Sequence, residues 1–150
     1  MDKTIHQRKR ARRVALQALY QWQHTQQNLT DIETQFHEEH ANAKAKVDWD
    51  YFAELLRGVA MRASEWDELI APSLDRSLDE LTPIEHAILR MACYELSERF
   101  DVPVKVVINE AVDIAKRFGA EQSHRYVNGV LDKIALQKRE VEMQAMRKKS

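Results

Sequence analysis

The sequence predicts an all-α protein that forms a single compact domain of six to seven helices. The 150 residues include only 3 Gly and 3 Pro, fewer than the many turns of a β-sandwich or barrel require. Apolar residues recur at spacings of three and four, which is the period of a helix. With 44% hydrophobic and 31% charged residues, the composition is that of a globular protein rather than a disordered one.

Three helical segments are expected in the first half of the chain. The first runs from about residue 7 to about residue 26. Thr30 and Glu33, three residues apart, match a capping box and predict a short second helix to about residue 40. Asp48 is expected to cap a third segment, which keeps its helical period as far as Ile70.

The clearest helix start in the chain is Thr82, Pro83 and Glu85, which combine a capping box with a proline at the first helical position. We expect residues 104–118 to be helical rather than a strand, because apolar residues continue at helical spacing through them. Gly119 follows at the place of a left-handed helix cap.

The last helix is expected to be capped by Ser123. Gly129 lies inside it, at a cost in helix stability, and therefore predicts a close approach of another helix. Residues 135–150 form a charged C-terminal extension, which we expect to be partly disordered.

The charge of the chain is unevenly distributed. The formal net charge is only -1, yet residues 1–13 carry six basic groups and one acid. Residues 65–85 carry seven acids and a single base, Arg76. Such asymmetry indicates a contact with a polyanion at the basic end. The acidic block is suited to attract a basic protein, although the pattern alone slightly favours a solvated surface there. A solvated surface without a ligand remains an alternative for each segment.

An arginine-rich arm, residues 1–13, leads into the first helix and is the strongest chemical signal. Its cations are Arg8, Lys9, Arg10, Arg12 and Arg13, besides Lys3. Arginine pairs with phosphate through two parallel hydrogen bonds, and clustered cations gain affinity by releasing counterions from a nucleic acid. The run predicts nucleic-acid binding but does not distinguish RNA from DNA.

A second candidate site is the stretch 118–126, which joins two expected helices. Phe118, His124 and Tyr126 are of the types that stack on unpaired bases. Lys116 and Arg125 are suited to hold phosphate, and Ser123 with the first N–H groups of the last helix is suited to meet an anion. Packing of Phe118 and Tyr126 in the core is the alternative, and the pattern alone favours it.

Catalytic and metal sites are not indicated. Asp79 and Glu80 are adjacent and so do not share a helix face, and no nucleophile accompanies them. His37 and His40 lack a third metal ligand at useful spacing. The single Cys93 excludes an internal disulfide and favours a reducing, cytoplasmic location. No apolar run approaches the roughly 20 residues that cross a bilayer, so we expect no membrane association, no metal and no cofactor.

Four stretches of the chain resemble the NusB family of transcription antitermination factors. They are residues 12–22 (RRVALQALYQW), 81–96 (LTPIEHAILRMACYEL), 107–119 (VINEAVDIAKRFG) and 123–133 (SHRYVNGVLDK). They occur in the family's order, and the resemblance covers residues 8–134. It implies an all-helical RNA-binding domain without catalysis.

The resemblance further implies binding to the boxA element of nascent ribosomal RNA leaders, together with the ribosomal protein NusE, in an antitermination complex of RNA polymerase. It places the arginine-rich start and the 118–126 stretch at the RNA. The residues that it places toward NusE are Tyr20, Arg76, Asp79 and Glu85. Residues 37–48 and those beyond Ile134 follow no pattern of the family that can be assigned.

Two other interpretations remain. NusB-like domains also occur as targeting modules of RNA cytosine methyltransferases, but only 16 residues follow Ile134, so we expect no catalytic domain. A structural homodimer without an RNA role is the other.

Overall fold

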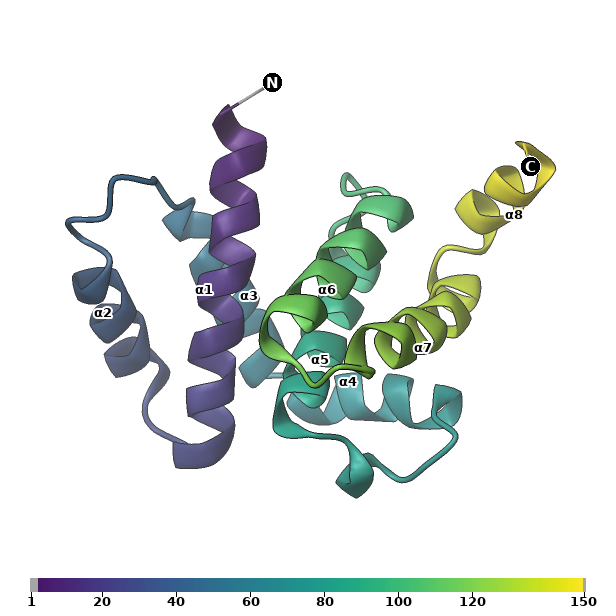
Figure 1. The fold of residues 1–150 in the computed structure, drawn as a ribbon, viewed down its shortest axis with the longest axis horizontal. Coiled ribbons are helices and arrows are strands. Elements are labelled where there is room, and N and C mark those ends of the chain that lie inside the picture. Colours follow the sequence, from purple (N-terminus) through teal and green to yellow (C-terminus); the bar gives the residue numbers. More distant parts are fainter. Residues whose placement is uncertain (1–2, 150) are drawn as a thin grey trace. The chain divides into compact units, whose positions relative to one another are not determined.

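Residues 3–149 are described by a computed structural model, and every regular element within that range is helical. It contains eight α-helices and two short 3-10 helices (Figure 1). The all-α prediction is confirmed. Residues 61–62 divide the segment that begins at residue 49 into two consecutive helices, which gives the upper expected number of seven. The count exceeds it because the C-terminal tail forms a helix of its own.

The helices group into two compact units, which meet in the sequence between Arg62 and Ala63. The first unit contains α1 (Lys3–Thr25), α2 (Leu29–Glu39) and α3 (Trp49–Ala60). Each of these three helices packs against the other two. Their fully buried side chains include Ile32, Phe52 and Leu55.

The start of α2 differs from the expected capping box. Asn28, not Thr30, is the N-cap, and its side-chain oxygen accepts hydrogen bonds from the main-chain N–H groups of Thr30 and Asp31 at 2.9 and 3.3 Å. Asn is among the preferred N-cap residues, and here it begins the helix two residues earlier than expected. Asp48 caps α3 as predicted, by accepting the N–H of Tyr51 at 3.0 Å.

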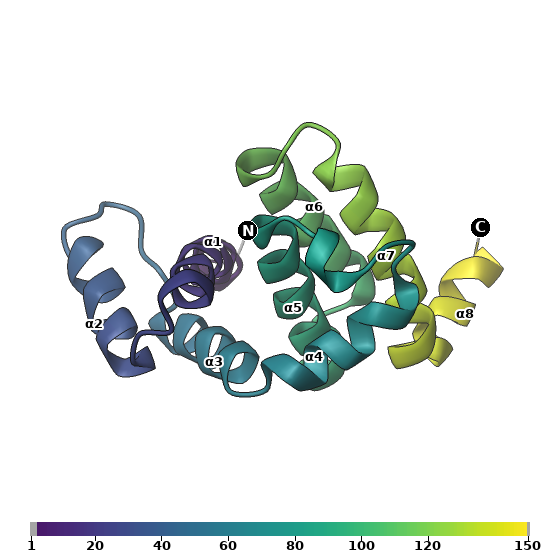
Figure 2. The same ribbon diagram turned by 90° about the horizontal axis from the view of Figure 1, so that it is seen from below.

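The second unit is built around α5 (Pro83–Glu98), which packs against three other helices, as Figure 2 shows. These are α4 (Ala63–Ile70), α6 (Val104–Phe118) and α7 (Ser123–Lys138). The 3-10 helices η1 (Ala71–Ser73) and η2 (Leu78–Glu80) lie between α4 and α5 in the sequence, and α8 (Glu140–Lys149) follows α7. The capping box at Thr82 is present as predicted.

Both glycine predictions for α6 and α7 are wrong. Gly119 has an extended backbone, with φ of -91° and ψ of 176°. Its lack of a side chain matters for another reason, since a Cβ there would lie 2.8 Å from the carbonyl oxygen of Ala115. Gly129 is exposed, and no other chain segment lies within 4 Å of where its Cβ would be. No helix therefore approaches α7 at that position.

Asp67 joins α4 to α5. Its carboxylate accepts from His86 Nε2 at 2.6 Å and, through both oxygens, from the guanidinium of Arg90 at 2.9 and 2.7 Å. Burial raises the pKa of Asp67, but the hydrogen bonds from His86 and Arg90 outweigh it and lower that pKa from 3.8 to about 2. The ionised carboxylate is therefore the form that fits this fold.

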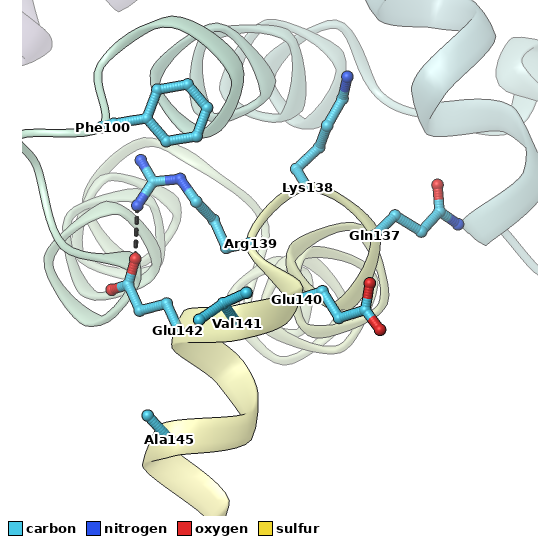
Figure 3. A pocket seen from close by; sticks show the side chains of 8 residues that line it. All are labelled: Phe100, Gln137, Lys138, Arg139, Glu140, Val141, Glu142 and Ala145. Atoms are coloured by element: carbon cyan, nitrogen blue, oxygen red, sulfur yellow. Dashed lines mark hydrogen bonds and ion pairs between the residues drawn. The ribbon is translucent and has the colours of Figure 1, made fainter.

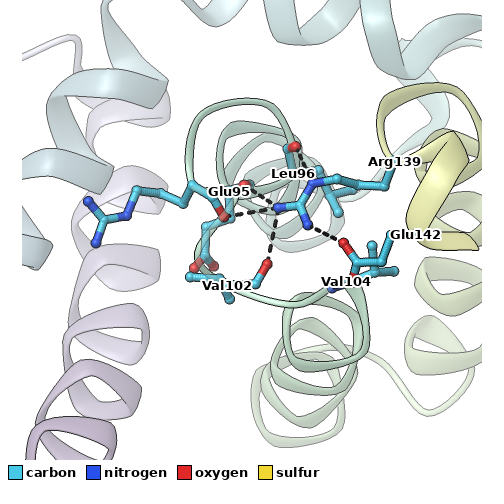
Figure 4. Close-up of polar contacts among 7 residues, drawn as sticks. Glu95, Leu96, Val102, Val104, Arg139 and Glu142 are labelled. Carbon is cyan, nitrogen blue, oxygen red and sulfur yellow. Dashed lines mark hydrogen bonds and ion pairs between the residues drawn. The ribbon is translucent and has the colours of Figure 1, made fainter.

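The C-terminal tail is ordered as α8, contrary to expectation, because a buried arginine ties it to the bundle. Arg139 is 4% exposed. Its guanidinium donates to the carbonyl oxygens of Leu96 at 2.9 Å, Arg99 at 2.9 Å and Val102 at 3.1 Å, and also to that of Glu95 (Figure 4). Arg139 thus adds a donor to four carbonyls at the end of α5 and the turn after it, where the carbonyls of Glu95 and Arg99 also accept the main-chain N–H groups of Arg99 and Val102.

Glu142, on α8, completes this connection. Its Oε1 accepts from Arg139 Nη1 at 2.7 Å, and its Oε2 accepts the main-chain N–H of Val104 at 2.7 Å. The latter bond caps α6, whose N-cap residue Pro103 has no side-chain oxygen to do so. Beside the pair lies a pocket of about 530 Å³, lined among others by Phe100 and Val141 (Figure 3).

We predict that Arg139→Ala lowers the free energy of unfolding by about 2–4 kcal/mol, because it leaves buried carbonyls and Glu142 without their donor. Lys148→Ala, which removes an exposed cation from α8, should change it by less than about 0.5 kcal/mol. Urea unfolding of both variants measures the difference. Equal effects would contradict the assigned role of Arg139.

Asp67 should make stability depend on pH in acid. A carboxylate with a pKa lowered from 3.8 to about 2 stabilises the fold above pH 3.8, and this contribution is lost as the pH falls toward 2. For a carboxylate partly open to solvent we expect about 1–2 kcal/mol. Asp67→Asn should remove that part of the acid dependence, whereas Glu68→Gln, at an exposed position, should retain it. Urea unfolding between pH 2 and 6 measures this, and identical profiles for the two variants would refute it.

Candidate nucleic-acid interface

The predicted basic arm is part of α1, which is helical from Lys3 onward; residues 1–2 of that arm lie outside the described residues. Arg8 and Arg12 are one helical turn apart and therefore share a face. Their guanidinium carbons lie 4.3 and 5.5 Å from the ring centroid of Tyr51 on α3. The two arginines thus pack on one buried aromatic ring, which is 3% exposed.

This geometry corrects one predicted contact. Arg12 is 4% exposed, so its guanidinium packs inside the protein and does not present itself to a phosphate. Lys9, Arg10 and Arg13 are partly exposed. Arg10 Nε donates to the carbonyl oxygen of Lys46 at 2.5 Å, which ties the 40–48 segment to α1.

Tyr51 was missed by the sequence analysis. The helical spacing of Tyr51 from other apolar residues of α3 indicates that it is buried, but it does not identify the residues of α1 that contact it. Only the packing of α1 against α3 brings Tyr51 beneath the arginines.

The second predicted patch lies where α6 ends and α7 begins. Lys116 and Arg125 are exposed, and Phe118, His124 and Tyr126 are partly exposed. The core packing of Phe118 and Tyr126 that the pattern alone favoured is therefore wrong. Within the second unit the fold thus gathers three aromatic rings and two cations at one helix corner.

The predictions that Ser123 contacts RNA and that Glu85 contacts the partner protein are corrected by the structure. Both are buried, and Ser123 Oγ donates to Glu85 Oε2 at 2.7 Å. Ser123 is the first residue of α7 and not its cap. Glu85 Oε1 also accepts the main-chain N–H of Thr82 at 3.1 Å. Ser123 is therefore not offered to an anion, and Glu85 is not offered to a partner protein; the two fix α7 against α5.

Arg76 and Tyr126 are in contact, although the sequence assigned one to the partner protein and the other to RNA. The Arg76 guanidinium carbon lies 3.9 Å from the centre of the Tyr126 ring. Asp75 Oδ1 accepts from Arg76 Nε at 3.0 Å and from Tyr126 Oη at 3.1 Å. The hydrogen bonds from Arg76 and Tyr126 lower the pKa of Asp75. Burial and the bond to Asp75 raise that of Tyr126.

Asp75 was likewise missed, since nothing in the sequence distinguishes it from the other acids of residues 65–85. The remaining predicted partner residues are at the surface. Tyr20 on α1 is 39% exposed and lies beside His24, with ring centroids 4.4 Å apart. Asp79 in η2 is exposed.

Other candidate chemistry is not supported. The rings of His37 and His40 contact Trp49, with centroids 4.5 and 6.0 Å away, and residues 3–149 contain no group of three or more potential metal ligands. Cys93 is buried, and burial raises the pKa of its thiol. Within the described range, no helix has both the length and the apolar character to cross a membrane.

Comparison with curated proteins gives close relatives. A transcription antitermination protein NusB of Idiomarina loihiensis is 57% identical over 126 residues, which is 84% of this chain and 89% of the relative. That of Saccharophagus degradans is 53% identical over 141 residues, 93% of each chain. These names denote transcription factors and not enzymes, which confirms the expectation of a non-catalytic protein.

Solved structures agree with this result. NusB of T. maritima has a TM-score of 0.75 at 34% identity, covering 88% of this chain and 96% of that one. NusB from a crystal structure of the antitermination factors NusB and NusE in complex with dsRNA has a TM-score of 0.75 at 30% identity, covering 84% and 93%. The NusB family model matches residues 9–136. The chain therefore belongs to the NusB family.

Proposed function

We propose that this chain is a transcription antitermination factor that binds RNA together with a NusE-type ribosomal protein. The observation that carries the proposal is the helix corner at residues 116–126, where aromatic rings and cations are exposed side by side in a fold shared with NusB. The curated relatives bear the antitermination name, and one similar structure holds NusE and RNA. The RNA is the boxA element of a ribosomal RNA leader, and the protein acts in the cytoplasm on elongating RNA polymerase.

The two basic regions have different tasks in this proposal. Cations on α1, namely Lys9, Arg10 and Arg13 with the outer part of Arg8, contact phosphates and supply affinity that depends on salt. The corner supplies sequence preference, because Phe118, His124 and Tyr126 offer ring faces to unpaired bases. Lys116 and Arg125 hold the phosphates of those nucleotides.

Two regions are proposed to contact the partner, each within its own unit: the acidic block in the second unit and Tyr20 in the first. Of the seven acids in residues 65–85, Asp67 is partly buried, Glu85 is buried, and both are hydrogen-bonded within the fold. Asp75 and Glu80 also accept hydrogen bonds within the fold. The exposed ones are Glu65, Glu68, Asp75, Asp79 and Glu80. Ribosomal proteins are basic as a class, so this surface is complementary to NusE in charge. The structure offers no observation that favours a homodimer over this heterodimer.

Fluorescence anisotropy of a labelled boxA-type single strand and a scrambled strand, each with and without NusE, tests the proposal. Tighter binding of the boxA-type strand, strengthened by NusE, is the expected result. Equal binding of both strands under all conditions would overturn it.

Arg10→Ala/Arg13→Ala should weaken RNA binding by roughly 5- to 30-fold and reduce the dependence of affinity on salt by about one to two released counterions. The matched control, Lys105→Ala/Lys148→Ala, removes two exposed cations from α6 and α8. Anisotropy titrations at several salt concentrations measure both quantities. If the control loses as much affinity as the α1 variant, the effect comes from net charge alone, and the assignment of Arg10 and Arg13 as phosphate contacts is wrong.

Gln122→Asp should weaken RNA binding several-fold. Gln122 is exposed and immediately precedes α7, beside the proposed phosphate contacts, so an added negative charge would repel the RNA backbone. Gln122→Asn adds no charge and should bind as the unaltered protein does. The same titration decides this, and unchanged affinity of Gln122→Asp would exclude a phosphate near this position.

A further inference from the structure

Asp75 is a single acceptor shared between two proposed binding surfaces. Its Oδ1 takes the Nε–H of Arg76 and the phenol of Tyr126, while the Arg76 guanidinium covers the Tyr126 ring. Tyr126 belongs to the proposed RNA corner, and Asp75 to the acidic surface proposed for a basic protein. The side chain of Asp75 is 67% exposed and that of Arg76 is 37% exposed, so both can be reached by ligands.

The RNA and the basic partner protein are suited to bind different members of this cluster, Arg76 and Asp75 respectively. An RNA phosphate binds the guanidinium of Arg76, which Asp75 neutralises in the free protein. A cationic side chain of a partner protein binds the carboxylate of Asp75, which Arg76 neutralises in turn. Binding of either ligand therefore requires the ion pair between Asp75 and Arg76 to break. Once one ligand has broken this pair, the other ligand binds a side chain that is no longer neutralised.

We propose that the cluster of Asp75, Arg76 and Tyr126 couples RNA binding to partner binding with positive cooperativity. The proposal rests on the function proposed above and adds the residues that connect its two ligands. When the partner's cation draws the Asp75 carboxylate away, Arg76 becomes a phosphate ligand and one face of the Tyr126 ring is uncovered for a base. Linkage requires that RNA strengthens partner binding by the same factor.

Asp75→Ala makes the coupling measurable. The quantity is the ratio of the RNA dissociation constants without and with saturating NusE, for a boxA-type single strand. For the unaltered protein we expect a ratio of roughly five or more. Asp75→Ala should bind RNA several-fold more tightly without NusE, since Arg76 is no longer neutralised, and its ratio should fall toward one.

Two further variants give the test its specificity. Glu38→Ala removes one exposed acid from α2, outside both proposed binding surfaces, and should keep the ratio of the unaltered protein. Tyr126→Phe keeps the ring but loses the bond to Asp75. If coupling passes through that bond, Asp75→Ala/Tyr126→Phe should have the same ratio as Asp75→Ala alone.

Failure of this inference is distinguishable from failure of the proposed function. An unaltered protein that does not bind the boxA-type strand with NusE overturns the function and the coupling with it. If the unaltered protein binds cooperatively but Asp75→Ala keeps the full ratio, the coupling assignment alone is overturned. A ratio reduced equally by Glu38→Ala also overturns it, because the loss of any surface acid would then suffice.

Discussion

The carboxylate of Glu85 connects the start of α5 to the start of α7, which forms part of the proposed RNA corner. One of its oxygens accepts the N–H of Thr82 and closes the cap of α5, and the other accepts the hydroxyl of Ser123 at the start of α7. A buried acid is stable only when its acceptors are satisfied, so both partners are required. The direction of the first turn of α7, and hence of His124, Arg125 and Tyr126, follows from this bond. In the proposed function, Glu85 therefore affects binding indirectly, by orienting the start of α7.

The net charge of -1 says little about partners because charges within the fold do not act at its surface. Arg12 packs on Tyr51, Arg139 fills the end of α5, and Asp67 is paired with Arg90. The remaining surface charges are separated, with cations on α1 and at the α6–α7 corner and acids between residues 65 and 80. Two ligands of opposite charge can thus be served by one small protein.

Two capping signals were predicted correctly, whereas the predictions at Thr30 and Gly119 and the long-range contacts were not. The capping box of Thr82 and the cap by Asp48 act over three residues, so sequence pattern reveals them. Ser123 also looked like a cap, but its hydroxyl is used by Glu85, 38 residues away. Arg139 reaches Leu96 over 43 residues, and Tyr126 reaches Asp75 over 51. Helical period indicates whether such residues are buried or exposed but does not identify their partners, so the connection between Asp75 and Tyr126 could not be predicted.

Whether the arginine-rich segment is already folded before RNA binds affects its affinity for RNA. An arginine-rich segment that folds only upon binding RNA loses conformational entropy at that moment. In this chain the segment is already helical from Lys3, and the 40–48 loop is hydrogen-bonded to it through Gln7 and Arg10. Arg8 and Arg12 are held on the ring of Tyr51. The conformational entropy of this segment is therefore lost when the protein folds and not when it binds RNA. In the proposed function, the role of Tyr51 is therefore to fix the face of α1 from which the partly exposed cations project, and not to contact RNA itself.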